Sequence, residues 1–215
     1  MKSALKFRIL VVLLVAVCSL NAQVYRIELG YNNPVRLGNN FSSTYFNGIQ
    51  LGGTAEYDLK NNLSLLTGVL YNFVYSDKLQ KYPNSTSVKY VSYGHFLDIP
   101  LHVTYTYPFS KTLKAFGYAG PNINIGLFQN MNITSTLTYN PSNPYYIQPR
   151  SLNVYGSDPV YQLNRINLQV GLGGGIQWKK YQLKAGYDFG INNLNKLDTG
   201  NMNLNGWHVT IGYSF

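Results

Sequence analysis

The chain has 215 residues, of which 12% are charged and 15% are aromatic, with 20 tyrosines, 20 glycines and a formal net charge of +9. So many aromatic residues and so few charges exclude an intrinsically disordered chain. The abundance of Gly and Tyr also argues against a helical bundle.

Residues 1–22 have the layout of a secretory signal peptide. Three basic residues precede an apolar run from Ile9 to Leu20, and Ala22 is a small residue suited to a cleavage site. A membrane anchor is disfavoured because a spanning helix needs about 20 apolar residues. A lipoprotein anchored at Cys18 is disfavoured because Val17 directly precedes this cysteine, where a small residue is expected. We therefore expect a mature domain of residues 23–215 with no cysteine and a net charge of +6.

The body of the chain alternates with a period of two. In residues 206–215, the odd positions are apolar or aromatic and the even positions are small or polar, which is typical of a strand between two different environments. Most such segments reach the 9–11 residues that a tilted strand needs to cross a bilayer. The pattern predicts eight strands, over residues 24–32, 45–59, 63–76, 90–107, 115–128, 163–178, 181–191 and 206–215.

The connections between these segments alternate in length. Those after the second, fourth and sixth strands are short, whereas residues 33–44, 77–89, 129–162 and 192–205 form long connections rich in Asn, Ser, Pro and Tyr. Outer-membrane barrels have this asymmetry, with short periplasmic turns and longer external loops. The sequence therefore predicts an all-β fold, an eight-stranded antiparallel up-and-down transmembrane β-barrel.

Two other barrel types share part of this pattern. A lipocalin-like barrel would turn the polar face to water, but here that face is rich in glycine and poor in charge, and the apolar face carries aromatic residues near the strand ends, as interfacial girdles do. A ten-stranded barrel would place a hairpin of 133–139 and 151–155 in the membrane, but three prolines interrupt it. We expect this hairpin to lie above the membrane.

Several segments carry a resemblance to a known family. They are Phe96–Leu101, Tyr118–Pro121, Gly171–Gly175 and the terminal Gly212–Phe215. With these, the chain resembles the PorT-like group of small outer-membrane β-barrel proteins over essentially its whole mature length. The resemblance implies a Gram-negative outer membrane. It also implies that Trp207, Tyr213 and Phe215 serve as a C-terminal signal for the outer-membrane assembly machinery. Because some members of this group serve a secretion system, the resemblance makes a role in a secretion assembly one of the functions to consider.

The inward face of the predicted barrel gathers charged side chains. An eight-stranded barrel is only wide enough for side chains to fill it, so these groups should pair with one another in a lumenal polar plug. The expected plug consists of Arg26, Glu28, Glu56, Asp58, Asp98, His102, Arg165, Lys184, Asp188 and His208.

The remaining basic residues include five lysines at the short turns. Lys60, Lys111, Lys114, Lys179 and Lys180 would lie near anionic lipid headgroups. Because the basic residues are not clustered with aromatic stacking positions, we expect no nucleic-acid partner. No His/Cys cluster suggests a metal, and no motif indicates a cofactor.

Catalysis finds little support in the sequence. Asp98 and His102 share one face of a strand but lie about 13 Å apart along it, so membership of the plug is favoured over an acid–base pair. Some outer-membrane barrels modify lipids with His, Ser and Asp near the outer rim, and His95, Ser92 and Ser87 are a weak counterpart. We expect no catalytic residues.

The long connection 129–162 is the best candidate for binding. It contains Tyr139, Tyr145, Tyr146 and Tyr155, and Tyr-rich polar surfaces suit recognition of proteins or glycans; an ordered, passive cap is the alternative. We expect an outer-membrane protein that contacts lipids, including lipopolysaccharide, and has a structural or binding role through its loops. The alternatives are a narrow pore and, less favoured, a lipid-modifying enzyme.

Overall fold

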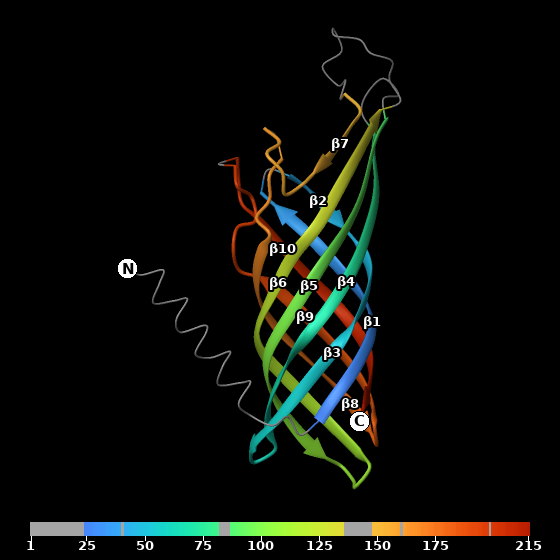
Figure 1. Cartoon of the computed structure of the whole chain (residues 1–215), viewed down its shortest axis with the longest axis vertical. Helices are drawn as coiled ribbons and strands as arrows, with labels where there is room; N and C mark the ends of the chain where they lie inside the picture. The colour runs from blue at the N-terminus through green and yellow to red at the C-terminus, as the bar shows by residue number, and fades with distance from the viewer. Residues whose placement is uncertain (1–23, 40, 82–86, 136–147, 160, 198) are drawn as a thin grey trace, which may run out of the picture.

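The computed structural model describes residues 24–39, 41–81, 87–135, 148–159, 161–197 and 199–215. These residues form a closed barrel of tilted antiparallel strands (Figure 1). No helix in this part of the chain is long and apolar enough to cross a membrane. The expected signal peptide and three of the four candidate loop tyrosines, Tyr139, Tyr145 and Tyr146, lie outside the described residues.

Eight long strands make the ring. They follow the order β10-β9-β8-β6-β5-β4-β3-β1, and antiparallel pairing of β1 with β10 closes the barrel. The strands are β1 (Val24–Gly38), β3 (Asn47–Lys60), β4 (Leu63–Lys81), β5 (Ser87–Pro108), β6 (Leu113–Ser135), β8 (Ile166–Trp178), β9 (Tyr181–Gly190) and β10 (Met202–Ser214). This ring confirms the eight-stranded up-and-down barrel.

Two short strands lie outside the ring at the end with the long loops. β2 (Phe41–Tyr45) pairs with β1, and β7 (Arg150–Asn153) pairs with β6. β6 and β7 form a hairpin near the expected place, but the paired residues are 130–133 and 150–153 and not the predicted segments 133–139 and 151–155. The ten-stranded alternative is wrong, because β7 has four residues and joins the described part of the ring at β6.

Alternation along each strand sorts side chains between the lumen and the outside. In β1, Arg26 and Glu28 are buried, whereas Tyr25, Ile27 and Leu29 are 58%, 52% and 56% exposed. The exposed apolar face continues around the ring, so it matches a hydrocarbon environment rather than water. The buried face is the narrow lumen.

Five strands, β1, β4, β5, β6 and β10, extend beyond their predicted limits into the long connections. β4, β5 and β6 reach furthest (Figure 1). In the extensions of β5, β6 and β10 the alternation inverts: Val88, Ile133 and Leu204 point inward and are buried, while Lys89 and Thr134 are exposed. Above the bilayer the outer face meets water, so apolar side chains turn to the inside. The predicted limits at residues 90, 128 and 206 were wrong because the apolar residues changed faces. Those at residues 32 and 76 were wrong because β1 and β4 continue into the mouth with polar side chains, such as Arg36 and Lys78, on the inward face.

A β-bulge on β6 makes part of this extension possible. His95 pairs with Phe128 and Phe96 pairs with Gly126, which leaves Leu127 as the extra residue. Because a bulge adds one residue to one strand, Leu127 and Phe128 both face outward and Gln129 turns inward, where it is fully buried.

The opposite end of the barrel has tight turns, such as Asn61 (φ 55°) and Asn62 (φ 64°) between β3 and β4. Two positive φ values suit a two-residue hairpin turn and favour Asn.

Candidate functional site in the lumen and at the extracellular mouth

Two buried ion pairs fill the lower half of the lumen. Arg26 lies 2.5 Å from Glu56, and Lys184 lies 2.5 Å from Glu28, and all four side chains are nearly inaccessible. Neutral hydroxyls complete the shells: Thr54 donates to Glu28 at 2.8 Å, and Ser64 donates to Glu56. These pairs are compensated charges of the kind a crowded lumen requires.

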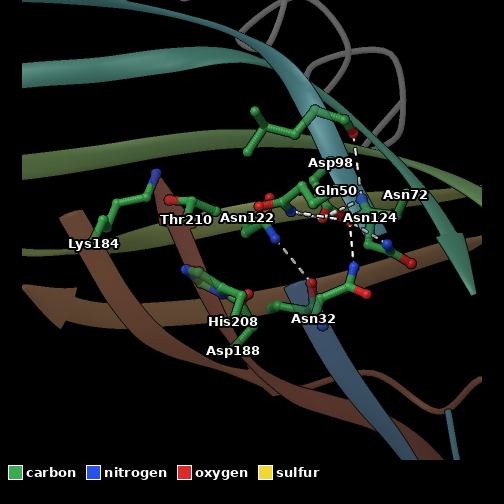
Figure 2. Close-up of polar contacts among 12 residues, drawn as sticks. Asn32, Gln50, Asn72, Asp98, Asn122, Asn124, Lys184, Asp188, His208 and Thr210 are labelled. Carbon is green, nitrogen blue, oxygen red and sulfur yellow. Dashed lines mark hydrogen bonds and ion pairs between the residues drawn. The ribbon is translucent and has the colours of Figure 1, made fainter. Parts of the chain in front are cut away.

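Amide side chains surround the carboxylate of Asp98 at the centre of the lumen. Asn72 and Asn124 donate to its two oxygens at 2.7 and 2.6 Å, and Gln50 is 3.4 Å from one of them. Figure 2 shows this cluster, in which Asn32 also donates to Asn72. Side chains from three other strands, β3, β4 and β6, thus converge on the carboxylate that β5 supplies. The sequence pattern placed Asp98 inward but gave no sign that amides, rather than cations, would surround it.

A third group joins aromatic and ionisable side chains across four strands. His208 lies 3.3 Å from Asp188, and the Tyr118 hydroxyl forms a 2.9 Å hydrogen bond with the other ring nitrogen of His208. His102 stacks on Tyr118 with ring centroids 4.8 Å apart. Tyr118 can reach His208 because Gly173 and Gly186 stand between them: a Cβ on Gly186 would lie 1.9 Å from the hydroxyl.

Eight of the ten predicted plug residues therefore line the lumen, and two lie elsewhere. Asp58 is exposed near the end of β3, because the lumen ends there and the side chain meets water. Arg165 is exposed just before β8 begins; it donates to the carbonyls of Gly126 and Leu127 and lies over the ring of Tyr155. Neither residue belongs to the buried network.

A hydrophobic cap closes part of the extracellular end. We define it as the buried residues Val88, Ile133, Leu152, Val154, Leu163, Leu194, Met202 and Leu204. Beneath it, Tyr155 packs on Phe46, Val74 and Phe96, and its hydroxyl occupies the space over Gly126. Burial raises the pKa of the Tyr155 hydroxyl to about 12. Tyr155 is thus a half-buried residue that packs beneath the cap.

The cavities that remain are small inside the barrel and larger at its two ends. The central cavities among the plug residues have volumes of about 40, 10 and 20 Å³. The cavity at the extracellular mouth measures about 280 Å³ and the one at the periplasmic turns about 310 Å³. The lumen between them is occupied by side chains.

The residues considered for lipid modification are not brought together. Ser92 is buried on the inward face of β5 and donates to the carbonyl of Asn130, while His95 lies on the outward face against Tyr71. No cluster of three or more His, Cys, Asp or Glu that could hold a metal occurs in the described ranges.

Aromatic residues form two belts on the outer face. Near the short turns, Trp178 stacks with Tyr181, and Tyr213 packs edge-on against both Tyr181 and Phe215. Nearer the long loops, Trp207 packs on Tyr31 with ring centroids 5.3 Å apart. Such belts mark the two interfaces of a bilayer.

The closed ring, the apolar outer face and the two aromatic belts define an integral β-barrel of the outer membrane. The chain belongs to the outer membrane protein beta-barrel domain family, whose model matches residues 18–196.

Among solved structures, the chain is similar to three outer-membrane proteins. The attachment invasion locus protein Ail of Yersinia pestis is 14% identical, with 91% of this chain and 100% of that chain covered and a TM-score of 0.38. Neisserial surface protein A is 12% identical, with 89% and 97% covered and a TM-score of 0.43. A major outer membrane protein from Thermus thermophilus is 16% identical, with 89% and 99% covered and a TM-score of 0.44. No curated protein matches the chain.

Proposed function

We propose that this protein is a closed barrel that acts as a binding protein of the cell envelope through its extracellular end. The observation that carries the proposal is the contrast between lumen and mouth. Paired charges and amides fill the lumen, with central cavities of no more than about 40 Å³. The mouth instead holds a cavity of about 280 Å³, built by strands that continue beyond the lipid-facing belt.

The same contrast argues against a pore. Ions would have to pass the Lys184–Glu28 pair and the stacked rings of His102 and Tyr118 inside the lumen. The Tyr118 hydroxyl is held by a hydrogen bond to His208. We expect the purified protein to give no stepwise conductance in planar bilayers.

Site-specific photo-crosslinking in intact cells tests the binding role. A photoreactive residue at Gln80, which lines the mouth cavity, should give adducts with an envelope or external component. The same residue at Thr112, in the exposed turn before β6, is the matched control. Stepwise conductance of the wild type, with no adduct from position 80, would overturn the proposal.

The absence of catalysis belongs to the same proposal. His95 and Ser92 project from opposite faces of β5, so they cannot act on one substrate. We expect lipid A to be chemically unchanged when the protein is deleted. A change in its acyl chains that the wild-type protein restores and His95→Ala does not would contradict this expectation.

The proposal also covers how the protein is exported and assembled into the outer membrane. Residues 1–22 would be removed as a signal peptide, so N-terminal sequencing should find Gln23 first. Trp207, Tyr213 and Phe215 would be read by the assembly machinery; in the folded barrel they lie on the exposed face of the closing strand and at its end. The lipid-facing surface would meet lipopolysaccharide in the outer leaflet. A PorT-like place in a secretion assembly is consistent with a closed barrel that binds through its mouth.

A further inference from the structure

The mouth cavity contains a buried cation with no carboxylate partner among the residues that the structure describes. Arg36 projects inward from β1 and is 5% exposed. Its guanidinium donates to the Tyr161 hydroxyl at 3.0 Å and to the Gln129 side chain at 2.8 Å, and it lies 5.2 Å from the ring centre of Phe46. All three partners are neutral, and Nε is buried without an acceptor.

The acids of the described chain are engaged elsewhere. Seven of the eight lie in this part of the sequence. Asp77 pairs with Lys89, and Asp158 pairs with Arg150. The other five are Glu28, Glu56, Asp98 and Asp188 in the lumen and Asp58 at the short turns. A buried, uncompensated charge is costly, so the position of Arg36 calls for an anion from outside these residues.

Two more cations and several hydroxyls line the same cavity. One of these cations, Arg150, is paired with Asp158. Lys78 projects inward from β4, and its ammonium donates to the carbonyl of Ser43 at 2.9 Å. Uncharged polar side chains line the cavity together with Arg36 and Lys78, and the rest of the lining is apolar and aromatic. The polar lining comprises Ser42, Thr44, Ser76, Gln80 and Ser92, and the apolar lining comprises Tyr90, Met131, Ile133, Tyr161 and Met202.

We infer that the mouth cavity binds an acidic sugar unit, with Arg36 and Lys78 holding its anionic group. The inference rests on the proposed binding role and names its ligand class. Guanidinium and ammonium groups form strong charge-assisted hydrogen bonds to carboxylate and sulfate oxygens. The hydroxyl and amide side chains match the hydroxyls of a sugar, and the aromatic and aliphatic wall matches its C–H face. A volume of about 280 Å³ lies near the lower end for ligand pockets and suits one sugar unit, free or at the end of a chain.

Binding of small probes to the detergent-folded mature protein tests this inference. Isothermal titration with glucuronate, glucose and inorganic sulfate separates the charge from the sugar. Because a hydrogen bond to a charged group contributes more than a tenfold change in binding, glucuronate should bind at least about tenfold more tightly than glucose. It should also bind more tightly than sulfate, which lacks the sugar.

Variants assign the binding to the cavity. Arg36→Met and Lys78→Met should each weaken glucuronate binding at least about tenfold. Lys196→Gln, which removes an exposed cation at the same end of the barrel, should leave it unchanged. Lys78 is only partly buried, so its variant keeps the test decisive if Arg36→Met fails to fold.

The inference and the proposed function fail in different ways. If the protein gives no conductance but binds glucuronate no more tightly than glucose, the acidic-sugar inference is overturned. The proposed binding role of the closed barrel is then unaffected. Equal affinity for sulfate and glucuronate, or undiminished binding by folded Lys78→Met protein, would also overturn the acidic-sugar inference. Ion conductance by the wild type would instead overturn the closed barrel.

Discussion

At the scale of single residues, glycines determine how the larger side chains fit into the lumen. Tyr118 on β6 lies beside Gly173 on β8, which pairs with Gly186 on β9, which in turn pairs with His208 on β10. The two glycines leave a trough along this row, and the Tyr118 ring lies in it. The hydrogen bond between Tyr118 and His208 therefore joins strands that are not neighbours in the ring.

Gly186→Ala should destabilise the barrel through Tyr118. The new Cβ would lie 1.9 Å from the Tyr118 hydroxyl, whereas its next nearest atoms are 3.0 Å away. Overpacking of this kind costs roughly 1–3 kcal/mol. The urea midpoint of the heat-modifiable gel shift measures this loss.

The partner variant decides whether Tyr118 is the cause. Tyr118→Phe removes the clashing oxygen, so Gly186→Ala should cost clearly less in the Tyr118→Phe background. If Gly186→Ala lowers stability equally in both backgrounds, then Gly186 does not act by leaving space for the Tyr118 hydroxyl.

Lys184→Met should be more damaging than the loss of any surface cation. Glu28 would remain buried without its ion pair, and breaking a buried pair costs roughly 3–5 kcal/mol. Lys89→Met, which breaks the exposed Lys89–Asp77 pair, should change stability by less than about 1 kcal/mol. The double variant Lys184→Met/Glu28→Gln should recover part of the loss in urea titrations. No recovery would show that Lys184 contributes by packing.

At the scale of strands, the period-two pattern predicted most of the barrel because lipid and lumen demand opposite side chains. Arg26, Glu28 and Lys184 could be found from parity and charge alone. Tyr118 could not be found in this way, because a tyrosine in such a strand is usually interpreted as part of an interfacial aromatic girdle. Gln129 could not, because the bulge at Leu127 moves it from the expected outward parity to the inside. Much of the mouth was predicted as loop because apolar residues of β5, β6 and β10, such as Val88 and Ile133, face inward there, and nothing in local periodicity marks the height at which lipid ends.

Deletion of Leu127 should leave the barrel folded. Leu127 is the extra residue of the bulge, so its removal keeps Phe128 outward and Gln129 inward. Deletion of Ile123, in the regular part of β6, should prevent folding, because it turns every later side chain of the strand to the other face. The gel shift of the two proteins refolded in detergent makes the comparison. If the Leu127 deletion fails as completely as the Ile123 deletion, the bulge is required for the ring itself.

At the scale of the whole molecule, charge divides the barrel into three zones. The lumen holds compensated pairs, and the described extracellular end carries seven lysines and arginines against two aspartates. The short turns carry Lys60, Lys111, Lys114, Lys179 and Lys180 against Asp58. Lys179 and Lys180 also lie over the rings of Trp178 and Tyr213, within the lower aromatic belt. The lysines at the turns thus lie at headgroup height, whereas Lys81 and Lys89 stand on strand extensions above the belt.

This arrangement predicts that anionic lipid stabilises the barrel from the side of the short turns. A lysine near an anionic surface contributes about 1 kcal/mol, so replacing Lys111, Lys114 and Lys180 by Gln should remove about 3 kcal/mol of the added stability in anionic nanodiscs. The matched variant with Lys81, Lys89 and Lys196 replaced should keep most of it. Urea unfolding in anionic and in zwitterionic nanodiscs measures the difference, and 1 M salt should abolish it because the screening length falls to about 3 Å. Equal losses from the two triple variants would show that net charge, and not the position of the lysines at the turns, governs the response to lipid.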